Sequence, residues 1–208
     1  SLWRGWSKNV GLLFFNRQPE KFFPATQIDV AYFPDGASGD IIEEKVFKAA
    51  LSRITQDALD YFKNCYIKET VIKHADKAQA QRFFNYPFAA IKEALVNAVY
   101  HRSYEKREPI EVRIDQDAIT IINYPWADHS VKIDDLRTGK AVTRRYLNRR
   151  IGDFLKELDL TEGLLTRIPK ISRVMRENGS PTPIFETDDE TSYFLIRLQI
   201  HAGALKDN

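Results

Sequence analysis

Several features that define other protein classes are scarce in this chain of 208 residues. Its single cysteine, Cys65, excludes an internal disulfide and a zinc cluster built on thiolates. No apolar run approaches the about 18 residues that a membrane-spanning helix needs. The first residues, SLWRGWSKN, lack the hydrophobic segment of a secretory signal. These absences predict a soluble protein of the reducing cytoplasm with no membrane partner.

Strong net charge is absent too. Lys and Arg number 31 against 29 Asp and Glu, a net charge of +2, so any nucleic-acid-binding surface must be local. The chain also lacks the Gly-x-x-x-x-Gly-Lys-Ser/Thr phosphate loop, which removes support for a helicase. With 43% hydrophobic and 12% aromatic residues, it can bury the core of one domain.

Hydrophobic periodicity predicts helices and strands in mixed order. Residues 9–15 form an apolar run that fits either type. Helices are expected over 43–62, 85–101, 147–158 and 168–178, and strands over 27–33, 66–72, 110–114, 118–122, 184–186 and 193–200. Asp115–Asp117 reads as a tight hairpin turn. Helices with largely antiparallel strands predict an α+β fold, a two-layer α/β sandwich.

The most informative stretch is Asn85–Tyr104, NYPFAAIKEALVNAVYHRSY. Asn85 is a candidate helix cap, Pro87 suits the first turn, and the helix is expected to end near His101. Glu93, Asn97 and His101 recur every fourth residue. This spacing places a carboxylate, a carboxamide and an imidazole on one stripe, roughly 6 Å apart along the helix axis.

Two interpretations of this stripe stay open. Polar residues at this spacing are commonly the solvated edge of an amphipathic helix. The alternative is a functional site, favoured by Asn97, because asparagine is a poor residue in the middle of a helix. A carboxamide there suggests a task such as holding a hydrated cation.

A second candidate feature is the segment 137–150, RTGKAVTRRYLNRR, which has six basic residues and no acidic one. One interpretation is a solvated loop and helix start. The other is an anion-binding segment in which Lys140, Arg144 and Arg149 contact phosphates, because guanidinium groups match phosphate oxygens. Those phosphates could belong to a nucleotide or to a nucleic-acid backbone, and the sequence does not choose.

Three stretches together resemble a known family: KEALVNAVYHRSY, the upstream NVGLLFFNRQPEKFFPATQIDV and the downstream LTEGLLTRIPKISRVMRENGSPTPIFETDDETSYFLIRL. They look like predicted transcriptional regulators described as RecG-related. In that family, a C-terminal module similar to the GHKL ATPases of the gyrase, chaperone and histidine-kinase type usually follows a Schlafen/AlbA-type putative DNA-binding domain.

The resemblance implies a GHKL (Bergerat) ATPase-like domain at residues 81–208. Residues 1–80 would be an N-terminal segment, partly a linker, that packs onto this core. DNA is then an expected partner through an upstream domain that this chain lacks. The absence of an initial Met fits a piece of a longer polypeptide.

The resemblance also implies roles for individual residues, with ATP and magnesium as the cofactors. Glu93 would be the catalytic general base that activates water, and Asn97 would hold the magnesium ion. His101 and Arg102 match the family pattern and take a supporting place near the phosphates.

Both glycine-containing loops depart from the family pattern. Where the family has Asn-Pro-Gly, this chain has Asn123-Tyr124-Pro125-Trp126, and in the E-G-x-G-x-G stretch only Gly163 remains. We therefore expect a degraded nucleotide site in a regulatory module without efficient turnover. Two alternatives stay open: an active Mg-dependent ATPase in which Arg144, Arg145 or Arg149 clamps phosphates, and a nucleic-acid-binding module that uses 137–150. A homo-oligomer is also open.

Overall fold

The computed structural model of the chain describes residues 3–36, 39–73, 79–125, 148–160 and 167–207. Its helices are α1 (Trp3–Phe15), η1 (Pro19–Lys21), α2 (Leu51–Cys65), α3 (Phe88–His101), α5 (Arg149–Glu157), α6 (Arg167–Asn178) and η2 (Ala202–Asp207). The strands are β1 (Ile28–Tyr32), β2 (Glu43–Phe47), β3 (Glu69–Ile72), β4 (Gln81–Phe84), β5 (Ile110–Ile114), β6 (Ala118–Asn123), β7 (Ile184–Glu186) and β8 (Phe194–Gln199).

Six of these strands form one mixed sheet in the order β2-β1-β5-β6-β8-β7. β1 and β5 run parallel, and the other neighbouring strands are antiparallel. A parallel pair needs a long crossover, which here includes α2, the separate β3–β4 hairpin and α3. Residues before and after position 80 therefore contribute to one sheet.

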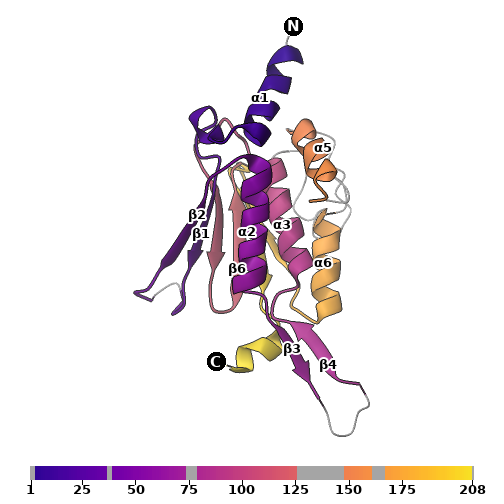
Figure 1. The fold of residues 1–208 in the computed structure, drawn as a ribbon. Helices are drawn as coiled ribbons and strands as arrows, with labels where there is room; N and C mark the ends of the chain where they lie inside the picture. Colours follow the sequence, from indigo (N-terminus) through magenta and orange to yellow (C-terminus); the bar gives the residue numbers. More distant parts are fainter. Residues whose placement is uncertain (1–2, 37–38, 74–78, 126–147, 161–166, 208) are drawn as a thin grey trace.

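α2, α3, α5 and α6 lie on one face of this sheet, as Figure 1 shows. α3 is central in the helical layer, since it packs against α2, α5 and α6 and against β6 and β8. Between residues 90 and 100 of α3, all side chains are buried except the half-buried Lys92. This arrangement confirms the predicted α+β class and places α3 at the centre of the molecule.

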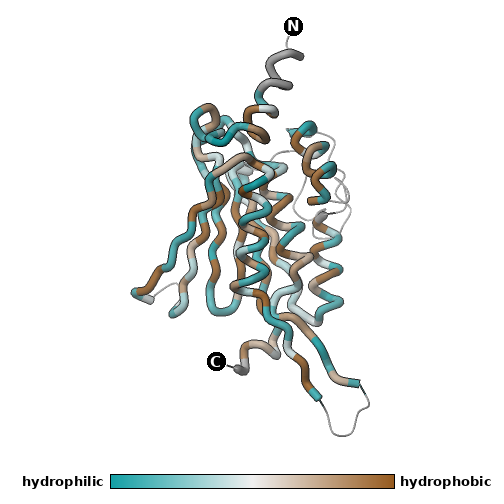
Figure 2. Tube along the Cα trace, in the orientation of Figure 1, coloured by the Kyte–Doolittle hydropathy of each residue, from teal (hydrophilic) through white to brown (hydrophobic). Residues whose placement is uncertain are grey.

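Side-chain alternation explains the core. In β1, Ile28 and Val30 are buried in the main core and Asp29 points to the opposite face. α5 buries Ile151 and Leu155, four residues apart, and exposes its charged side. Figure 2 shows the same alternation of hydrophobic and hydrophilic residues along α5 and α6.

One predicted helix was wrong at its start. Residues 43–62 have helical periodicity, but Glu43–Phe47 form β2 and α2 begins only at Leu51. β2 pairs with β1, and the Phe47 ring lies 5.6 Å from the Tyr61 ring of α2. Tertiary pairing thus decided a segment whose local pattern suits either structure.

The start of α3 also differs from the prediction. Its N-cap residue is Pro87, and no side chain caps the helix. Asn85 instead accepts the Lys68 backbone N–H at 2.8 Å and donates to the Tyr66 carbonyl at 2.7 Å. It therefore ties the end of α2 to the entry of α3, while the helix ends at His101 as predicted.

Other local predictions are confirmed. β5 and β6 form the antiparallel hairpin around Asp115–Asp117. α6 ends at Asn178, and Gly179 has φ +78°, the left-handed conformation that favours glycine after a helix. Among the helices described, none has the length and apolar character needed to cross a membrane.

Candidate functional site

The polar stripe predicted on α3 lies mostly inside the protein. Glu93 is only 3% exposed and Asn97 5% exposed, whereas His101 at the helix end is half-buried. Buried carboxylates and carboxamides are uncommon because each must replace the hydrogen bonds it had with water. At Glu93 and Asn97 the stripe is therefore not a solvated helix edge.

The Glu93 carboxylate is paired across the helical layer. Lys170 of α6 places its Nζ 2.8 Å from Glu93 Oε1, and both side chains are largely buried. Each charge thus compensates the other in a region of low dielectric. If Glu93 took a proton from water, it would become neutral and leave the Lys170 ammonium without this counter-charge, which opposes a role as general base.

Asn97 lies one helical turn after Glu93 on the same stripe. Its side chain makes no hydrogen bond with any part of the chain that the structure describes, although it is almost fully buried. A magnesium ion could take the carboxamide oxygen as a ligand. Because no group of three or more His, Cys, Asp or Glu among the described residues could hold a metal, its other ligands would be phosphate oxygens and water.

Arg102, directly after α3, is held elsewhere. It is 1% exposed, its Nη2 donates to the Pro24 carbonyl at 3.3 Å, and its guanidinium lies 5.0 Å from the Tyr104 ring centroid. Burial lowers its pKa. Its Nε is buried and has no hydrogen-bond partner in the described part of the chain. These contacts attach Arg102 to the connection before β1, away from the Glu93 carboxylate.

A further residue, Asn148, joins two helices and was not predicted. Its Nδ2 donates to the Tyr100 carbonyl at 2.9 Å and to the Arg102 carbonyl at 2.7 Å. The last carbonyls of a helix lack partners within the helix, so Asn148 satisfies the end of α3 from the start of α5. The only sequence signal was an asparagine at the start of the helix predicted over 147–158.

The loop after β6 lies beside the end of α3, as the hairpin predicted. Asn123 is 1% exposed and its Nδ2 donates to the Pro125 carbonyl at 3.4 Å. The Tyr124 carbonyl accepts the Ser103 N–H at 3.1 Å. Asn123 is therefore held in the core, close to the C-terminal end of α3 at His101.

The basic segment is mostly beyond what the structure describes. Lys140, Arg144 and Gly163 lie outside the described residues, so the predicted phosphate contacts at these positions stay predictions. Arg149 is exposed as the first residue of α5, a helix that contacts α3.

Lys170, the partner of Glu93, was not predicted from the sequence. Helical periodicity does not reveal which residue of a distant helix a side chain will contact.

Comparison with known proteins gives a fold likeness. No family profile and no curated protein matches the chain. The crystal structure of the DIP2311 protein from Corynebacterium diphtheriae is similar, with a TM-score of 0.71 and 17% sequence identity. The match covers 92% of this chain and 37% of the other protein. At this identity the likeness shows a shared fold, and this chain corresponds to about a third of that protein.

Proposed function

We propose that this chain is an ATPase-like regulatory module of a DNA-associated transcriptional regulator, with a GHKL-type fold and slow or absent nucleotide turnover. Support for the fold type comes from the motif E-x-x-x-N-A-x-x-H, which lies on a central helix against a mixed sheet. The association with DNA rests on the sequence resemblance alone.

The observation that carries the proposal is the ion pair between Lys170 Nζ and Glu93 Oε1 at 2.8 Å. A general base must accept a proton in the transition state. Here that step takes away the counter-charge that lies 2.8 Å from the Lys170 ammonium, which is unfavourable in a mostly buried ion pair. A site can bind nucleotide under this restraint and still hydrolyse it poorly.

A working Mg-dependent ATPase is the second candidate, favoured by Asn97. Its side chain makes no hydrogen bond to other described residues, so the carboxamide oxygen can serve as a ligand for magnesium. The two candidates agree on binding and differ in turnover.

Binding is tested by calorimetric titration with a non-hydrolysable ATP analogue and magnesium. Both candidates expect heat of binding that Asn97→Ala weakens. If the chain binds no nucleotide at millimolar concentration, both fail, and the fold serves as a scaffold for protein or DNA partners.

Turnover is tested by phosphate release from ATP. Our proposal expects release near background in the unmodified chain and a rise of about tenfold in Lys170→Gln, where Glu93 is relieved of its cation. Adding Glu93→Gln to Lys170→Gln should remove this gain. Lys92→Gln is the matched control, because Lys92 is a neighbouring cation that donates to the Asp159 carbonyl at 3.0 Å instead.

The outcome that favours the second candidate is equally clear. If the unmodified chain releases phosphate and Glu93→Gln abolishes the release, Glu93 already acts as the base and Lys170 does not restrain it. If Lys170→Gln and Lys92→Gln raise release equally, the effect is one of general charge and the ion pair is not its cause.

A further inference from the structure

β2 is the terminal strand of the six-stranded sheet and has one open edge in the described part of the chain. Figure 1 shows it at the margin of the sheet, on the side away from α6. Each of its residues is exposed except the half-buried Phe47, and Val46 is 47% exposed. An open strand edge can pair with another polypeptide.

The backbone hydrogen bonds of β1 show which residues of β2 have free backbone groups. The Gln27 carbonyl and the Phe33 N–H bond to β5, so odd-numbered residues of β1 face β5 and even-numbered ones face β2. The even residues are opposite Glu43, Lys45 and Phe47. By alternation, Glu44 and Val46 direct their N–H and C=O groups to the open edge.

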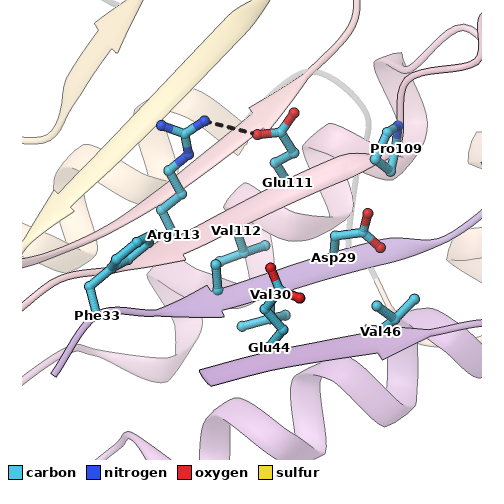
Figure 3. Close-up of a pocket in the computed structure, with 10 residues that line it drawn as sticks. Asp29, Val30, Phe33, Glu44, Val46, Pro109, Glu111, Val112 and Arg113 are labelled. Carbon is cyan, nitrogen blue, oxygen red and sulfur yellow. Dashed lines mark hydrogen bonds and ion pairs between the residues drawn. The ribbon is translucent and has the colours of Figure 1, made fainter. Parts of the chain in front are cut away.

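The side chains along this edge carry opposite charges at its two ends. Glu44 and Val46 project from the face opposite the helices, as Figure 3 shows beside Asp29. Lys48 follows β2 and is exposed. Within the described chain, neither Glu44 nor Lys48 forms an ion pair. They are about 13 Å apart along an extended backbone, too far to pair with each other.

We propose that β2 pairs antiparallel with β2 of a second copy of this chain, around a two-fold axis at Val46. Glu44 of each copy then lies opposite Lys48 of the other, which satisfies both charges twice. Lys45 lies opposite Phe47 of the second copy, matching the contact in which Lys45 Nζ is 5.9 Å from the Phe47 ring of its own chain. The two sheets become one continuous sheet.

The charges select this register over its neighbours. An axis at Lys45 brings Lys45 against Lys45, and an axis at Glu44 brings Glu44 against Glu44. An axis at Phe47 overlaps the strands least and leaves Glu44 without Lys48. Like charges directly opposite one another destabilise a strand pair. Only the axis at Val46 places opposite charges against each other without also placing two like charges together. The charged edge of β2 therefore disfavours other strand pairings and permits this one dimer.

Charge exchange tests the register by sedimentation velocity over a range of protein concentrations. We expect a reversible dimer whose dissociation constant rises about tenfold in Glu44→Lys and in Lys48→Glu. The double variant Glu44→Lys/Lys48→Glu should recover the original dimer, because each pair is reversed. A monomer at all concentrations, or a dimer that Glu44→Lys leaves unchanged, overturns the proposal.

Cross-linking tests the axis. In a Cys65→Ser background, Val46→Cys should join two chains with a short bismaleimide, since residues on the axis have Cα atoms about 5.5 Å apart. Val71→Cys is the matched control, because Val71 is a valine on β3 with 40% exposure and is remote from the axis. Equal cross-linking of the two variants would contradict pairing at Val46.

Discussion

Two buried charged residues lie on or next to α3, and the groups that surround them differ. Glu93, in the middle of the helix, has a counter-ion 2.8 Å away on α6. Arg102, just past its end, has no ion pair in the described structure and is held by the Pro24 carbonyl and the Tyr104 ring. Burial lowers the pKa of Arg102, because the surroundings solvate its charge less well than water does.

The difference lies in how the surroundings compensate each charge. The contacts of Arg102 with the neutral Pro24 carbonyl and Tyr104 ring attach the end of α3 to the segment before β1. An apolar side chain of similar volume could provide much of the same stabilisation by packing. The Glu93–Lys170 ion pair joins α3 to α6, and each of its charges compensates the other. Glu93 lies one helical turn before Asn97, whose side chain makes no hydrogen bond to other described residues.

The largest expected effect comes from breaking the pair. Lys170→Ala should lower the free energy of unfolding by about 3 kcal/mol, because it leaves the Glu93 carboxylate buried without its counter-ion. Denaturant unfolding measures this change. The double variant Glu93→Leu/Lys170→Leu is the control and should lie within about 1 kcal/mol of the unmodified chain. If the double variant is as unstable as Lys170→Ala, packing and not charge explains the loss.

A smaller effect is expected at the other charge. Arg102→Met keeps most of the side-chain volume and removes one long hydrogen bond and one cation–π contact, so unfolding should change by about 1 kcal/mol or less. The same denaturant assay compares it with Lys170→Ala. A loss as large as that of Lys170→Ala would show that Arg102 depends on charge compensation too, and the comparison would fail.

The smallest effect concerns His201, a polar ring whose neutral form is favoured by folding. His201 stacks on Phe83 at 3.8 Å, its Nδ1 accepts the Gly203 N–H at 3.0 Å, and burial lowers its pKa below the usual 6.5. The unfolded chain therefore binds this proton more readily, so acidification below pH 6.5 should reduce stability. Unfolding midpoints at several pH values measure this loss, and His201→Gln should show less of it. An identical pH dependence in His201→Gln would assign the loss to other groups.

Much of the local structure could be predicted from sequence. The helix ending at His101, the hairpin around Asp115–Asp117 and the glycine after α6 each depend on residues close in sequence. The helix predicted over 43–62 was wrong at its start because Glu43–Phe47 pair with β1 and form β2. The cap predicted at Asn85 failed because its amide meets Lys68 and Tyr66 instead.

For the candidate site, sequence alone determined the spacing of Glu93, Asn97 and His101, since helical geometry repeats every 3.6 residues. Only the tertiary structure decided that two of them are buried, that Glu93 meets Lys170, and that Arg102 turns to Pro24. Periodicity acts over one turn of a helix. Charge pairing and burial depend on which distant segments pack together, and a local pattern does not contain that information.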